Sequence, residues 1–166
     1  MSTTRNPRRL LNETEILQVT QAVQWAHPGM DFDLAERIVM QTLAYVDTVS
    51  HSGPDATLAA PPAIAAGWQV LVLHTRVYAR LNCLFRVYGN DVPVHHTPQD
   101  PAAPPDPGAV DQTAAAVAAT GYLVDADLWQ PGLSVADLIA AASEAPSEAT
   151  VPHGSEPSVG RAHCGP

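Results

Sequence analysis

The sequence predicts a mainly α-helical protein, a small single-domain helical bundle around one central buried helix. Three observations lead to this fold class. Apolar residues recur at helical spacing, capping residues or Pro and Gly mark where the segments begin and end, and 166 residues suit one domain. We expect the helical domain over residues 12–145, with Pro-rich loops between helices and disordered ends over 1–11 and 146–166.

Capping residues predict the first two helices. Asn12 and Glu15 fit a capping box that opens a helix ending before Pro28. Asp33 and Glu36 repeat this pattern for a second helix. The second helix is amphipathic, with an apolar stripe made by Leu34, Ile38, Tyr45 and Val49.

A third helix is predicted over about residues 63–88, because Pro61 and Pro62 suit a first turn. One face is apolar and carries Val70, Leu73, Val77, Leu81, Leu84 and Tyr88. The opposite face is mixed and carries Trp68, Val72, Thr75, Ala79, Cys83 and Arg86. Since apolar residues occur on both faces, we expect this helix to be covered on both sides and to lie at the centre of the bundle.

The remaining elements are shorter. A short extended segment is expected after Gly89. An Ala-rich helix over about residues 106–120 is capped by the glycine that follows it. The apolar segment YLVDADLW comes next, and a last short helix starts with the capping pair Ser134 and Asp137.

The charge balance limits the classes of partner. The net charge is −9, and the 8 cationic residues are all Arg, a Lys-free composition typical of GC-rich bacterial genomes. Nucleic acids and anionic membranes require clustered cations, and Arg5, Arg8 and Arg9 are too few, so neither partner is expected. No apolar run reaches the roughly 20 residues that span a bilayer and no secretory signal is visible, which predicts a cytoplasmic protein.

Cys83, His95 and His96 are the candidate ligands of a metal site. Zinc or another transition metal needs three or four such groups at about 2.0–2.3 Å. Adjacent histidines of an extended segment point to opposite faces, so one of the two would join Cys83. His74 lies on the opposite side of the helix from Cys83 and points away. The alternative is that no cofactor is bound and Cys83 is a buried apolar residue.

Gln69, Arg76 and, beyond the helix, His95 are the candidates for binding a ligand. Gln69 and Arg76 share one helix face because they lie seven residues apart. An enclosed Arg76 needs a carboxylate partner, and Asp125 or Asp127 is available. Arg76 is therefore expected to form a structural ion pair or, alternatively, to anchor the carboxylate of a ligand.

His74 and Tyr78 are four residues apart and can touch on a helix. They are candidates for an acid–base couple at the edge of a pocket, and His96 is a third catalytic candidate. The alternative is that His74 and Tyr78 form a plain hydrogen-bonded pair at the rim of the core.

Several uncommon residues hold the spacing Trp, Leu-x-Thr-x-x-Tyr, Cys, Gly and His-His-x-Pro, namely Trp68, Leu73, Thr75, Tyr78, Cys83, Gly89, His95, His96 and Pro98. With the later GYLVDADLW, this pattern resembles an uncharacterised family of small, mostly actinobacterial proteins labelled "glycine-rich domain-containing protein-like". The similarity covers roughly residues 12–130. The family's Asp and His are replaced here by Ala65 and Gln69. The resemblance implies no established activity.

Three functions are compatible with these residues, and the sequence does not decide whether the protein is an enzyme. The first is a non-catalytic accessory or interaction module of bacterial metabolism, secondary metabolism included, that engages a protein or a small-molecule ligand. The second is a small biosynthetic enzyme with a polar pocket formed by His74, Arg76, Tyr78, His95 and His96. The third is a metal-binding protein that uses Cys83 with His95 or His96.

Overall fold

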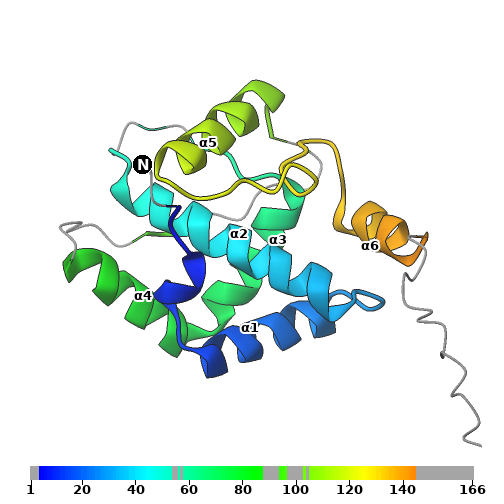
Figure 1. Cartoon of the computed structure of the whole chain (residues 1–166), viewed down its shortest axis with the longest axis horizontal. Coiled ribbons are helices and arrows are strands. Elements are labelled where there is room, and N and C mark those ends of the chain that lie inside the picture. The colour runs from blue at the N-terminus through cyan, green and yellow to red at the C-terminus, as the bar shows by residue number, and fades with distance from the viewer. Residues whose placement is uncertain are drawn as a thin grey trace, which may run out of the picture.

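The fold is all-α, as predicted, in the computed structural model, which describes residues 4–53, 56, 58–87, 94–96, 103 and 105–144 (Figure 1). The helical elements of this part of the chain are η1 (Pro7–Leu10), α1 (Glu13–Ala26), α2 (Phe32–His51), α3 (Pro62–Leu73), α4 (Thr75–Val87), α5 (Pro107–Ala119) and α6 (Val135–Glu144). None of these helices is long and apolar enough to cross a membrane.

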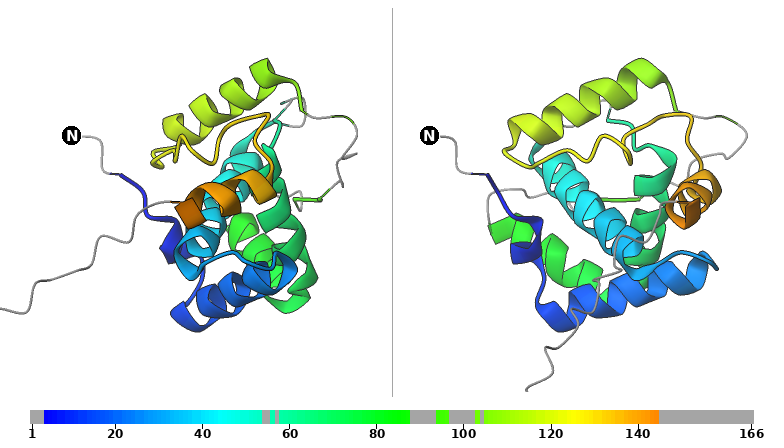
Figure 2. Two further views of the ribbon diagram at one scale, coloured as in Figure 1. Left: turned by 90° about the vertical axis from the view of Figure 1, so that its right-hand side faces the viewer. Right: turned by 45° about the vertical axis from the view of Figure 1, so that its right-hand side comes forward.

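Helix α2 is the central element, so the prediction of a central helix over residues 63–88 is wrong. η1, α1, α3 and α5 all pack on α2, and α1 and α5 lie on its opposite sides (Figure 2). Residues 41–48 of α2 are all buried. The side chains of Gln41, Thr42, Asp47 and Thr48 have hydrogen-bond partners: the Thr48 hydroxyl, for example, donates to the carbonyl of Ala44 at 2.8 Å. Such bonds let a helix with polar side chains occupy the core.

The predicted third helix is divided at His74, where the backbone leaves the helical region (φ −80°, ψ 64°) and α4 takes a new direction (Figure 1). The buried apolar residues are Ala63, Ile64, Ala65, Trp68, Val70 and Leu71 in α3, and Val77, Leu81 and Phe85 in α4. On one continuous helix, Trp68 and Val77 are nine residues apart and would point in opposite directions, about 180° apart. A single straight helix would turn only one set toward the core, and the break allows both sets to be buried.

Helix α3 crosses α2 at Gly67. A Cβ atom at this position would lie 2.3 Å from Oγ1 of Thr42 and 2.8 Å from Cγ2 of Ile38. Only glycine allows the two backbones to approach so closely. The next residue, Trp68, packs edge-on against Tyr45 of α2, with ring centroids 5.2 Å apart.

The predicted helix starts are confirmed with one shift. The capping box of Asn12 and Glu15 opens α1, with both hydrogen bonds present. Helix α2 is capped by Asp31 and not by Asp33: the Asp31 carboxylate accepts a bond of 2.7 Å from the Leu34 amide. Asp106 caps α5 and the pair Ser134 and Asp137 precedes α6, as expected.

The N-terminal segment is ordered from residue 4, so the prediction of a disordered stretch over 1–11 is wrong for residues 4–11. Leu10 and Leu11 are buried in the core, and the Arg5 amide donates to the carbonyl of Gly121 at 2.8 Å. Burial of the two leucines and the main-chain hydrogen bond offset the conformational entropy that is lost when this short segment becomes ordered. The predicted tail over 146–166 and the segment around Gly89 lie outside the described residues.

Candidate functional site

The candidate residues on α3 and α4 lie mostly at the surface. The exposed side chains are Gln69, Thr75, Arg76, Ala79, Cys83 and Arg86. The expectation that this stretch is covered on both sides is therefore wrong for α4, which buries one face and exposes the other. The break at His74 is the reason, because it turns the second face of α4 away from the core.

Asp125 and Asp127 pair with Arg37 of α2, and the predicted pairing with Arg76 is wrong. Nε and Nη2 of Arg37 donate to the two Asp125 oxygens at 2.8 and 2.9 Å, and Nη2 donates to Asp127 at 3.1 Å. These bonds raise the pKa of Arg37 further, the contact with Asp125 being the largest cause. The surface location of Arg76 removes the need for a buried partner.

Gln41, one turn further along α2, holds the same segment by its amide. Its Nε2 donates to the Leu123 carbonyl at 3.0 Å, while its Oε1 accepts from the Trp129 indole at 2.8 Å and from the Asp125 amide at 3.3 Å. Gln41 is buried, so these bonds form away from solvent. The segment 122–129 is thus attached to α2 by side chains that sequence reasoning did not single out.

Tyr78 and His96 come together around Trp68, whereas His74 does not join them. The Tyr78 hydroxyl accepts from the Trp68 indole at 3.1 Å and donates to the Val94 carbonyl at 2.8 Å. The His96 ring stands edge-on to Trp68, with centroids 4.7 Å apart. Burial raises the pKa of Tyr78 and lowers that of His96. The tyrosine hydroxyl is therefore occupied by structural bonds at neutral pH.

His74 contacts its own helix. Its Nδ1 lies 3.0 Å from the Val70 carbonyl, so the ring contacts the main chain of the last turn of α3. The predicted side-chain pair of His74 with Tyr78 has no hydrogen bond within the described part of the chain. The four-residue spacing assumed a continuous helix, which the break at His74 removes.

The candidate metal ligands do not converge. Among the described residues, which include Cys83, His95 and His96, no three His, Cys, Asp or Glu side chains lie close enough together to hold a metal ion. Cys83 is a free, exposed thiol, contrary to the expectation of a buried apolar residue. Solvent reaches it because it lies on the outer face of α4.

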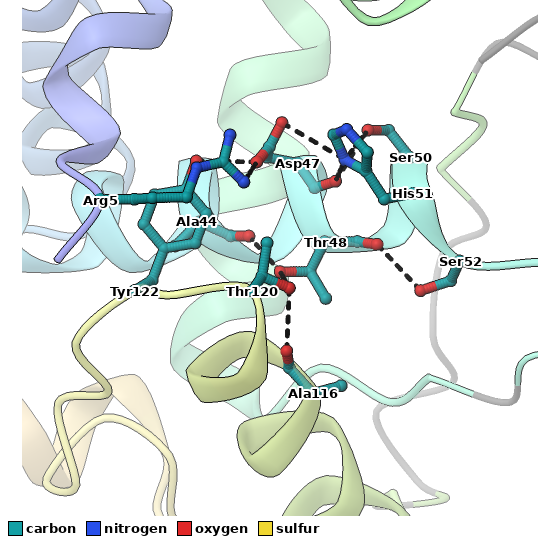
Figure 3. A network of polar contacts seen from close by, with 10 residues as sticks. All are labelled: Arg5, Ala44, Asp47, Thr48, Ser50, His51, Ser52, Ala116, Thr120 and Tyr122. Atoms are coloured by element: carbon teal, nitrogen blue, oxygen red, sulfur yellow. Dashed lines mark hydrogen bonds and ion pairs between the residues drawn. The ribbon is translucent and has the colours of Figure 1, made fainter. Parts of the chain in front are cut away.

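A polar cluster that sequence reasoning missed surrounds Asp47 of α2 (Figure 3). The Asp47 side chain is 1% exposed, and its Oδ2 accepts a hydrogen bond of 2.7 Å from the Tyr122 hydroxyl and faces Nη1 of Arg5 at 2.9 Å. The Arg5 guanidinium also lies over the Tyr122 ring, 4.7 Å from its centroid. Burial and the neighbouring carboxylate raise the pKa of Tyr122, so its hydroxyl remains a donor.

His51 lies one turn after Asp47 on α2, and both of its side-chain hydrogen bonds in the described part of the chain involve the ring nitrogen Nδ1. Its Nδ1 is 2.7 Å from the Asp47 carbonyl and 3.1 Å from the Ser50 hydroxyl. The carbonyl can only accept, so Nδ1 carries the hydrogen and Nε2 of the neutral ring is left as an acceptor. In a Ser–His–Asp triad, the serine hydroxyl contacts one ring nitrogen of the histidine and the carboxylate contacts the other. Ser50 shares Nδ1 with Asp47, so these residues do not form one.

A recess of about 470 Å³ opens beside this cluster. It is lined by the side chains of η1 and its flank, the end of α2, α4 and the segment after α5, namely Arg5, Asn6, Arg9, Leu10, His51, Leu84 and Tyr122. Among these lining residues none is acidic. The arrangement offers guanidinium and amide donors beside an apolar wall, which suits binding of an anion more than covalent chemistry.

One sequence signal for this site was available. Asp47 is the only charged residue in the run LAYVDTVS, within a stretch whose periodicity predicts burial. A carboxylate on a buried helix face needs partners, so it marks a polar cluster. Nothing in the sequence identifies Arg5 or Tyr122 as those partners, because they lie 42 residues before and 75 residues after Asp47.

Comparisons with known proteins gave no significant match among protein-family models, curated proteins or solved structures. The resemblance to the actinobacterial family therefore stays a prediction.

Proposed function

We propose that the protein is a non-catalytic accessory module that acts by binding, and that the recess beside Asp47 is its binding site. The composition of the recess carries this proposal. Its described lining residues include two guanidinium groups and an imidazole but no serine, threonine, cysteine or carboxylate. The nearby carboxylate of Asp47 is 1% exposed and occupied by Arg5 and Tyr122, so it is not available as a general base.

The positions of the predicted catalytic residues support the same proposal, because Tyr78 and His96 meet at Trp68 without His74. An active site needs a nucleophile or base, its orienting partner and an accessible place for substrate within a few ångströms. His74 contacts its own helix, Tyr78 is bonded to Trp68 and to main chain, and Arg76 faces solvent. The polar pocket expected from these side chains has no counterpart in the described contacts.

Incubation of the full-length protein with a cell metabolite extract tests this function. We expect compounds to co-elute with the protein in gel filtration and to keep their mass. Leu84→Trp, which fills the recess, should reduce the retained amount about ten-fold. Leu73→Trp adds the same ring at a position that is 79% exposed and serves as the matched control.

Conversion of a metabolite would contradict the proposal. Specifically, a product that accumulates with time in the presence of the wild-type protein, and that disappears for His51→Gln or His96→Gln, would make the protein an enzyme. Equal retention by Leu84→Trp and wild type would place the binding site elsewhere. Thermal unfolding of each variant checks that the fold is intact.

A further inference from the structure

We infer that the recess beside Asp47 takes the carboxylate of a small organic acid with an apolar or aromatic body. This inference rests on the proposed function, and it names the chemical class of the ligand. Three properties of the recess lead to it: its sign of charge, the one free guanidinium group, and the apolar side chains opposite that group.

The recess is cationic on a chain that is strongly acidic. The net charge of the chain is −9, yet the described lining residues include Arg5 and Arg9 and no acid. Asp47, which lies behind the lining, cancels the charge of Arg5. One positive charge is left for a ligand, which matches a monoanion such as a carboxylate better than a dianionic phosphate.

Arg9 is the residue available to bind the carboxylate. Its exposed guanidinium has no ion pair within the described part of the chain, whereas Arg8, its neighbour in η1, is paired with Glu13 and Glu36. Arg5 is held in place over Tyr122 and on Asp47. A planar guanidinium can give two parallel hydrogen bonds to a carboxylate, which favours a carboxylate over a spherical anion such as chloride.

The apolar part of the ligand has a surface to contact. Leu10 and the Tyr122 ring are buried, and Leu84 of α4 is half-buried. All three line the recess, whose volume of about 470 Å³ lies within the usual range for small-molecule sites. A purely inorganic anion would leave the exposed part of Leu84 uncovered. An organic acid covers this part and places its charge toward η1.

Titration of the ¹⁵N-labelled full-length protein with sodium benzoate tests the ligand class. We expect saturable shifts of the amide resonances of Asn6, His51 and Tyr122, at constant ionic strength. Benzamide, which has the same shape without the charge, should bind about ten-fold more weakly. Arg9→Gln should weaken benzoate binding about ten-fold, whereas Arg86→Gln, the same change of charge at an exposed position of α4, should leave it within about two-fold.

Each other outcome overturns the inference in a distinct way. Equal affinity for benzoate and benzamide would make the recess a site for neutral ligands, and the proposed function would stand. Tighter binding of inorganic phosphate would make it an inorganic anion site. Absence of saturable shifts at these amides, or equal affinities of Arg9→Gln and Arg86→Gln, would remove the carboxylate site. Metabolite conversion in the extract experiment would instead remove the proposed function.

Discussion

The hydroxyl group of Tyr122 donates a hydrogen bond of 2.7 Å to Oδ2 of Asp47, a side chain that is 1% exposed. Arg5 reaches the same oxygen at 2.9 Å. A carboxylate this deeply buried is stable in the core because the two donors replace its hydration. Through Asp47, helix α2 holds both the N-terminal segment and the segment after α5, and these segments form two sides of the recess.

Asp47→Ala should lower the free energy of unfolding by about 3 kcal/mol. The substitution leaves the Tyr122 hydroxyl without its acceptor in the core. It also removes the partner of Arg5, but the Arg5 side chain is 42% exposed and is hydrated at little cost. Urea denaturation followed by circular dichroism measures the change. Asp111→Ala on the exposed side of α5 is the control, with an expected change within about 0.5 kcal/mol. Similar losses for both variants would contradict a special role of Asp47.

Gly67→Ala should destabilise the protein by about 2 kcal/mol, because a Cβ atom would overlap Oγ1 of Thr42. Gly53→Ala is the matched control, since nothing lies within 4 Å of a Cβ atom there. Thr42→Ala removes the clashing oxygen. The double variant should therefore lose less free energy of unfolding than the sum of the two single losses, as measured by thermal and urea unfolding. Strict additivity would show that the close approach of α2 and α3 is not what requires glycine.

Gln41→Ala should lower the free energy of unfolding by about 2 kcal/mol and loosen the segment 122–129. The variant leaves the Trp129 indole and the Leu123 carbonyl without their partner on α2. Amide hydrogen exchange at Asp125 and the indole proton resonance of Trp129 report the change locally. Arg37→Ala removes the more exposed ion pairs of the same segment and should lower the free energy of unfolding by about 1 kcal/mol or less. A larger effect of Arg37→Ala would contradict the importance of the buried amide.

Burial beside Trp68 lowers the pKa of His96 below 6.5. The folded state therefore favours the neutral ring, and its contribution to stability is complete above pH 6.5 and is lost as the pH falls through the lower folded-state pKa. NMR titration of the imidazole resonances should give a midpoint below 6.5. In His96→Gln this part of the acid-induced loss of stability should be absent. A midpoint at or above 6.5 would contradict burial of the ring against Trp68.

Local chemistry made several helix starts predictable. The pair Asn12 and Glu15 and the pair Ser134 and Asp137 satisfy orphan amide groups within a few residues, so their effect does not depend on the rest of the fold. At α2 the sequence offers two similar caps, Asp31 and Asp33, and spacing alone did not distinguish them. Predictions of this kind succeed where the interaction is local and unique.

Capping and periodicity act between near neighbours, so the helical class and the approximate places of α1, α2, α5 and α6 follow from the sequence alone. The tertiary structure decided which helix is central, where the stretch after Pro62 breaks, and where the candidate site lies. Periodicity shows which residues are apolar but not which neighbour covers them, so α4 was wrongly expected to be enclosed. The recess unites Arg9, His51, Leu84 and Tyr122, which only the folded chain brings together.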